Sequence, residues 1–339
     1  MVKKTKKINW GSVLYLVMLA LFVWLLYSRW DEIVVIMQSW HQVGWKLMLV
    51  ALVFEILVYF MQAKAYQYIY GLFGLRVRWG RIYWLLLKSF FMSVVAPTGG
   101  FVIGAGVMID DGKKMGFAKT KLLLANIVYW MMFFTVFIFF LLISLFLLMI
   151  KNQMQDYILI PAIILLIAAS AVLTVMVIML KDYQRFKDYS LWFGEIFNKV
   201  NRTLGRNVTW LSEKKIRKYS FELYEGYFYV ISNVFRLRRI VLMLILMIGC
   251  NVLLLATLVA SVGGDFGNIG VLMATYVIAA LLMMVSVTPS GLGVVELAMT
   301  SLLSAFVLPA SGAVLVVVMF RFFQFWLPLI SGFFVFRKK

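Results

Sequence analysis

Two charged residues stand out because each lies in apolar sequence. Glu296 follows a break within residues 285–296, and Arg321 lies in the next apolar segment. A charge at membrane depth costs about 2.5 to 3.5 kcal/mol on insertion scales, so both residues need partners. A guanidinium can hold a phosphate through two parallel hydrogen bonds, while the carboxylate balances it or meets a cationic head group. The pair therefore predicts a phospholipid site or, alternatively, a buried ion pair that joins two helices.

The break before Glu296 contains Pro289, Ser290, Gly291 and Gly293. Water does not satisfy freed backbone groups inside a bilayer, so an interrupted helix persists only where protein or a hydrated cavity surrounds it. A half-helix starting at Ser290 and Gly291 would direct free N–H groups toward a phosphate, and glycine allows close backbone approach. The alternative is a proline kink in one long helix.

An upstream stretch repeats the proline, the hydroxyl residue and the glycine of this break in the same order. It consists of Pro97, Thr98, Gly99 and Gly100. Two interrupted apolar segments, one in each half of a chain, indicate a transporter-like binding site. We therefore include these four residues in the predicted substrate site.

Secondary candidates are Glu55, well inside its apolar segment, and Lys88, in the arm before Pro97. Glu55 and Glu296 are both candidates for ion coupling, with facilitated movement down a gradient as the alternative. Lys88 can also extend its ammonium to the membrane interface without a role in the site. Gly104 and Gly106 form a small-residue pair that predicts tight helix packing.

The composition identifies the class of protein. The 339 residues are 64% hydrophobic with a formal net charge of +19, and the mean hydropathy is +0.96. This combination indicates an all-α polytopic membrane protein rather than a soluble domain. The Lys and Arg residues lie between apolar segments, so we expect contact with anionic lipid of the inner leaflet and not with nucleic acid.

Metal and cofactor chemistry is not expected. His41 and Cys250 are the only residues of their types, whereas a zinc site usually takes three or four such ligands. A single cysteine also excludes a disulfide within the chain. The sequence has no nucleotide-binding loop and no Ser-His-Asp set, so we predict no cofactor and no metal.

The distribution of basic residues sets the predicted topology. We expect the protein to lie in the cell membrane with both termini in the cytoplasm. This orientation follows from the lysines near the start and from Arg337, Lys338 and Lys339 at the end. Six full crossings are expected, within a single membrane domain over residues 1–339. They cover residues 10–27, 44–61, 122–150, 158–180, 240–262 and 313–334.

The two broken segments are predicted to be re-entrant helical hairpins. If residues 82–109 crossed once, the connection 181–239, with thirteen Lys or Arg against six Asp or Glu, would lie outside. The arms 269–288 and 291–307 enter from the other side, because their turn carries no cation; two full crossings are the alternative. Opposed hairpins are the arrangement of inverted repeats.

The connection 181–239 is the only sizeable polar region and mixes aromatic residues with cations. This mixture predicts interfacial amphipathic helices on the cytoplasmic side. A solvated pair of linker helices is the alternative.

The chain resembles the transmembrane region of the lysylphosphatidylglycerol synthase family, the flippase-like domain of the multiple peptide resistance factor. The match is closest in residues 289–296 and 321–332, and looser in residues 89–112. Family members often carry an acid and an Arg just after the first break, but residues 101–109 are uncharged here. That difference weakens any substrate role inferred from those charges.

The resemblance implies translocation of an anionic or aminoacylated phospholipid, such as lysylphosphatidylglycerol, and a link to cationic peptide resistance. In relatives a separate soluble domain performs the aminoacyl transfer; this chain reaches Lys339 directly after its last span, so we expect no lysyltransferase activity in it. The resemblance is compatible with a homodimer. The alternatives are a carrier of another lipid, such as an isoprenoid phosphate or glycolipid, and a non-transporting partner of a separate synthase.

Overall fold

The structure, a computed structural model, describes residues 44–95, 100–152, 156–203, 213–232, 234–285, 291 and 293–337. In these ranges all regular structure is helical and no strand occurs, which confirms the predicted all-α class. The predicted first span, residues 10–27, lies outside the described residues. So do five of the predicted site residues, namely Pro97, Thr98, Gly99, Pro289 and Ser290.

Four helical stretches in the described part of the chain are long and apolar enough to cross a membrane. They are α3 (Trp45–Leu72), α6 (Lys119–Ile150), the stretch Phe235–Ser261 of α10 (Val234–Ser261), and Ala310–Arg337. A 28-residue helix is about 42 Å long, which exceeds a hydrocarbon core of about 30 Å. The protein is therefore a multi-pass membrane protein.

Two of the expected spans differ from the prediction in extent. Helix α3 continues to Leu72 rather than ending at residue 61. Past that point, the ammonium of Lys64 lies 5.7 Å from the ring centres of both Phe60 and Trp79, so aromatic faces accommodate the charge that marked the expected end. Helix α7 (Asp156–Lys181) covers the expected fourth span, and its apolar run of described residues is the shorter Ala162–Val175.

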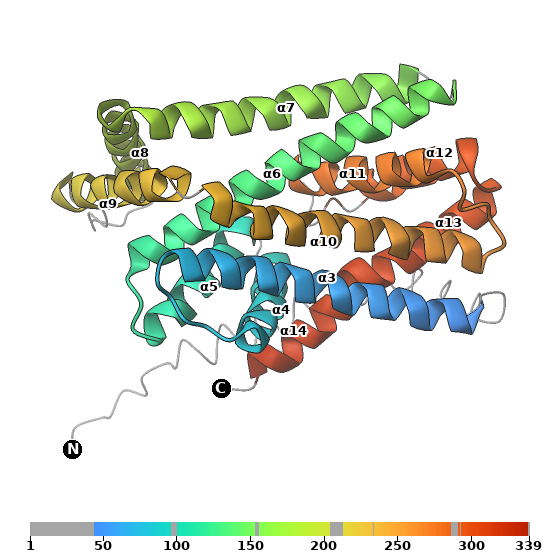
Figure 1. The fold of residues 1–339 in the computed structure, drawn as a ribbon, viewed down its shortest axis with the longest axis horizontal. Coiled ribbons are helices and arrows are strands. Elements are labelled where there is room, and N and C mark those ends of the chain that lie inside the picture. Colours follow the sequence, from blue (N-terminus) through green and yellow to red (C-terminus); the bar gives the residue numbers. More distant parts are fainter. Residues whose placement is uncertain are drawn as a thin grey trace.

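Helices α3 and α10 form a long antiparallel pair in the membrane domain (Figure 1). The N–H of Gly44, before α3, donates to the carbonyl oxygen of Ser261, at the end of α10, over 3.4 Å. The start of α3 and the end of α10 therefore lie at one end of the molecule. The end of α3 and the start of α10 lie at the other.

Two pairs of short helices pack as hairpins. The first is α4 (Trp79–Val95) with α5 (Gly100–Lys114), and the second is α11 (Ile269–Val285) with α12 (Val294–Phe306). None is longer than about 26 Å at 1.5 Å per residue. The first hairpin follows the end of α3 and the second follows the end of α10, so they begin at opposite ends of the molecule (Figure 1).

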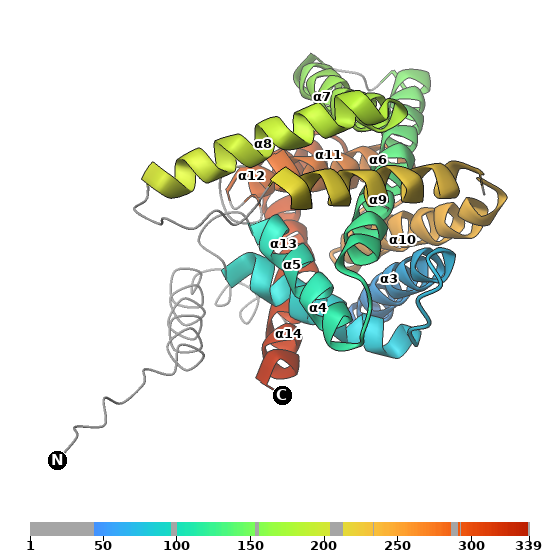
Figure 2. The ribbon, with the colours of Figure 1, turned by 90° about the vertical axis from the view of Figure 1, so that its left-hand side faces the viewer.

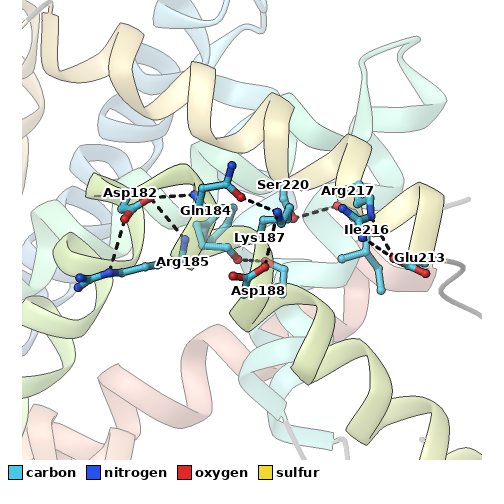
Figure 3. Close-up of polar contacts among 11 residues, drawn as sticks. Asp182, Gln184, Arg185, Lys187, Asp188, Glu213, Ile216, Arg217 and Ser220 are labelled. Atoms are coloured by element: carbon cyan, nitrogen blue, oxygen red, sulfur yellow. Dashed lines mark hydrogen bonds and ion pairs between the residues drawn. The ribbon is translucent and has the colours of Figure 1, made fainter.

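Helices α8 (Tyr183–Thr203) and α9 (Glu213–Ser232) lie together beside the start of α10 (Figures 1 and 2). The polar contacts drawn in Figure 3 join residues close in sequence, as when Glu213 accepts hydrogen bonds from Arg217. Aromatic contacts connect the two helices, since the ring of Tyr183 lies 5.7 Å from that of Phe221. The pair is thus held by apolar packing.

Candidate functional site

The second hairpin turns through two glycines with left-handed backbones. Gly291 has φ 70° and Gly293 has φ 88°, a region that side chains with a Cβ rarely adopt. Helix α12 consequently begins at Val294, later than the expected start at Ser290 and Gly291. The N–H of Gly293 donates to Oε2 of Glu296 over 2.7 Å. This N–H group at the helix start is therefore occupied by the chain's own carboxylate, which also suits the positive end of the helix dipole.

Arg321 ends α13 (Ala310–Arg321) and faces this turn. Its Nε lies 2.8 Å from Oε1 of Glu296, and its Nη2 donates to the carbonyl oxygen of Gly291 over 3.4 Å. The Arg321 side chain is 3% exposed and that of Glu296 is 20% exposed, so the pair is enclosed on the guanidinium side and partly open on the carboxylate side. The two charges expected to need partners are thus partners of each other, and they join α12 to α13.

A second polar cluster begins one turn beyond Arg321. Residues Phe322–Trp326 form a π-helical turn, η3, a distortion frequent at functional sites. Within it, Nε2 of Gln324 donates to Oε2 of Glu55 over 2.8 Å and to Oδ1 of Asn251. The amide of Asn251 is oriented by its own donation to the carbonyl of Met247 over 2.9 Å. Glu55 and Asn251 are each 2% exposed, so the cluster joins α3, α10 and η3 in the interior.

Asn251 and Gln324 were not predicted as site residues. Both are neutral amides in otherwise apolar runs, so they lack the charge that drew attention to Glu55 and Arg321. A signal was present, since Gln324 follows Arg321 by about one helical turn and buried amides in membrane helices commonly bond across helices. The extra residue of the π-helical turn changes which face Gln324 occupies, and spacing alone does not show it.

In the first hairpin, charge pairing lies away from the turn. Nζ of Lys88, on α4, lies 3.7 Å from Oδ1 of Asp111, on α5, with both side chains partly exposed. At the exposed end of α5, Lys114 lies 2.9 Å from Asp110, and its hydrogen bond lowers the pKa of that carboxyl group. The structure thus pairs Lys88 within its own hairpin.

The glycines of the first hairpin differ in their surroundings. Ser89 Oγ donates to the carbonyl of Gly104 over 2.7 Å, and a Cβ on Gly104 would lie 3.0 Å from that hydroxyl. The predicted close packing is therefore confirmed for Gly104. It is wrong for Gly106, where a Cβ would meet no atom of the described residues within 4 Å. Gly100 is the first residue of α5.

These features define a multi-pass helical membrane protein whose interior carries an ion pair beside a broken helix and a carboxylate-amide cluster one turn away. Within this class, the chain belongs to the family described as the lysylphosphatidylglycerol synthase TM region, which it matches over residues 10–332. The family predicted from the two motifs is thereby confirmed. No curated protein matches the chain.

Proposed function

We propose that this protein moves an anionic or aminoacylated phospholipid, such as lysylphosphatidylglycerol, between the leaflets of the cytoplasmic membrane. The observation that carries the proposal is the Glu296–Arg321 pair, a guanidinium and a carboxylate 2.8 Å apart beside an interrupted helix. Membership of a lipid-related membrane family supports it. Cationic lipid delivered to the outer leaflet would lower the negative surface charge that attracts cationic peptides.

The site supports a mechanism in which partners are exchanged. The phosphate replaces Oε1 of Glu296 as the partner of Arg321, because guanidinium geometry suits two phosphate oxygens. Glu296 keeps its bond from the N–H of Gly293 and turns its other oxygen to the ammonium of an aminoacyl head group. With an aminoacylated lipid, charge stays balanced throughout, since each ion leaves one partner of opposite sign for another.

Access to Arg321 requires α12 and α13 to separate, since the Arg321 side chain is 3% exposed. The two short hairpins start from opposite ends of the molecule, which suits alternate opening of the site toward each leaflet. On this proposal both hairpins are re-entrant, the two chain termini are cytoplasmic, and Pro97, Thr98, Gly99, Gly100, Pro289 and Ser290 line the route.

Helices α8 and α9 are proposed to rest on the inner leaflet. Their exposed aromatic side chains include Trp192, 55% exposed, and Phe228, 47% exposed. Cations on the same helices would meet anionic head groups, at about 1 kcal/mol for each Lys or Arg near the surface. The arrangement keeps the substrate leaflet close to the first hairpin.

Leaflet exchange in proteoliposomes tests the proposal. Fluorescent phosphatidylglycerol, lysylphosphatidylglycerol, an isoprenoid phosphate and phosphatidylcholine are compared at equal protein incorporation, with Arg321→Gln as the control. We expect phosphatidylglycerol or its lysyl ester to move faster than phosphatidylcholine, and the variant to abolish the difference. Selective movement of the isoprenoid phosphate would identify another lipid carrier. If no lipid moves faster than in protein-free liposomes, transport is refuted and a partner of a separate synthase is favoured.

A further inference from the structure

Glu55 is the carboxylate in the interior that the lipid mechanism does not use. It is 2% exposed and lies in the middle part of α3. Its Oε2 accepts one hydrogen bond, from the neutral amide of Gln324, while within the described residues Oε1 has no hydrogen-bond partner. One neutral donor does not compensate an ionised carboxylate in such surroundings, so the protonated form is favoured while the site stays dry.

The groups around Glu55 provide no compensating positive charge in the part of the chain that the structure describes. The titratable side chains that interact with it electrostatically are the phenols of Tyr59 on α3, Tyr83 on α4 and Tyr276 on α11. On α10 and η3 the facing groups are the neutral amides of Asn251 and Gln324. The groups that surround the carboxylate can donate or accept hydrogen bonds but cannot neutralise its charge.

The packed elements carry other ionisable groups that are already engaged. Tyr129 on α6 accepts a hydrogen bond from Gln62, and Lys88 on α4 pairs with Asp111. Arg321, one turn before Gln324, pairs with Glu296. Cys250, next to Asn251 on α10, is a partly buried thiol that is uncharged at neutral pH.

A hollow with hydroxyl groups in its lining adjoins Glu55. Glu55 lines a hollow of about 190 Å³ between α3, α4 and α14 (Leu327–Arg337). Its polar lining includes Tyr59, Tyr83 and Ser331, whose hydroxyl groups can each donate and accept a hydrogen bond. The volume is sufficient for several water molecules at about 30 Å³ each. Water in this hollow would stabilise the ionised carboxylate of Glu55 and give its proton a path for exchange.

We propose that Glu55 is a proton-binding site that exchanges its proton through this hollow and is coupled to the lipid site through Gln324. The bound proton resides on Oε1, while Oε2 keeps its bond from Gln324 in both states. Arg321 directly precedes the π-helical turn, and Gln324 lies within it. A rearrangement at Glu55 and the separation of Arg321 from Glu296 would therefore both shift this turn. The coupling part of this inference rests on the proposed lipid transport; the proton site does not.

Infrared difference spectroscopy of the purified full chain, titrated across neutral pH, tests the site directly. We expect a protonated-carboxyl band that disappears on raising the pH and is absent in Glu55→Gln. Glu195→Gln, which alters an exposed carboxylate on α8, should retain it. Gln324→Leu keeps the carboxyl group but removes its hydrogen-bond donor, so the band should persist at a shifted frequency. A spectrum unchanged in both Glu55→Gln and Gln324→Leu overturns the proton site.

The coupling is tested in proteoliposomes under an imposed pH gradient. We expect the gradient to change the leaflet-exchange rate of phosphatidylglycerol by roughly fivefold or more in the wild type, and not in Glu55→Gln. Exchange that responds equally in both proteins overturns the coupling. If no leaflet exchange of lipid is seen either with or without the pH gradient, lipid transport itself is refuted. The infrared result still decides whether Glu55 binds a proton.

Discussion

The two helical hairpins share one pattern, two short helices with a proline in the sequence between them, but are stabilised differently. In the second hairpin, Glu296 stands at the start of α12 and pairs with Arg321. In the first, the paired charges Lys88 and Asp111 lie toward the open end. Close packing holds the first hairpin against α14, because a Cβ on Gly332 of α14 would collide with the carbonyl of Leu87 on α4.

This difference suggests a division of roles. A hairpin bound by an ion pair can exchange one ionic partner for another, so the second is suited to ligand binding. A hairpin bound by close backbone packing offers no such exchange and is suited to move as a unit with α14. Gln324 lies between the two, where α13 passes into η3 and α14.

Breaking the ion pair should have the largest effect on stability. Arg321→Gln leaves Glu296 without its cation, and loss of one partner of a buried pair costs about 3–5 kcal/mol. The Glu296→Gln/Arg321→Gln double variant should recover most of this loss, since neither charge remains. Thermal unfolding in detergent measures the stability of the single and the double variant. Equal destabilisation by the single and double variants would show that the pair is not the support of the second hairpin.

The turn of the second hairpin should respond next. Gly291→Ala should destabilise by about 3 kcal/mol, because it combines strain at φ 70° with a Cβ placed 2.6 Å from Val295 Cγ2. Gly293→Ala carries the same backbone strain, but its Cβ would meet no atom of the described residues within 4 Å, so it should cost about 1 kcal/mol. The two melting temperatures provide the comparison. A larger loss of stability in Gly293→Ala than in Gly291→Ala would contradict the described geometry of the turn.

The packing of the first hairpin is tested at Gly332. Gly332→Ala should separate α14 from α4 and destabilise by about 2 kcal/mol, as overpacking does. Gly106→Ala is the matched control, because among the described residues its Cβ meets no atom within 4 Å, and alanine favours a helix by about 1 kcal/mol over glycine. We expect opposite shifts in melting temperature. Shifts of the same sign and size would refute close packing as the support of this hairpin.

The smallest effect is expected for the charges of the first hairpin. Lys88→Met or Asp111→Asn should change stability by less than about 1 kcal/mol, because the 3.7 Å pair is partly exposed. Leaflet exchange should also stay near the wild-type rate. A loss of exchange as large as that of Arg321→Gln would place lipid binding in the first hairpin and reverse the comparison.

Much of the second hairpin could be predicted because its informative residues are charged. Glu296 and Arg321 are conspicuous in apolar sequence, and the need for partners predicted their importance. The sequence did not reveal that Glu296 caps α12, since that depends on left-handed backbones at Gly291 and Gly293. The role of Gly332 was also hidden, because it depends on which helix approaches it.

The Glu55 cluster illustrates the same limit. Glu55 was noticed by its charge, whereas its partners Gln324 and Asn251 are neutral and come from distant segments. Spacing along a regular helix does not place Gln324, because a π-helical turn rotates the residues that follow it. The presence of the apolar helices and the need of the buried charges for partners were therefore predictable, whereas helix ends and the facing of neutral side chains were not.

The most direct measurement is the initial rate of leaflet exchange of phosphatidylglycerol in proteoliposomes containing the Glu296→Gln/Arg321→Gln double variant. This variant should fold well, so the rate reports on lipid handling rather than on damage to the structure. With the guanidinium absent, we expect the rate to fall at least about tenfold below the wild type, as loss of charged hydrogen bonds to a phosphate requires. A rate equal to that of the wild type, from protein with an intact fold, would contradict a lipid site at Arg321.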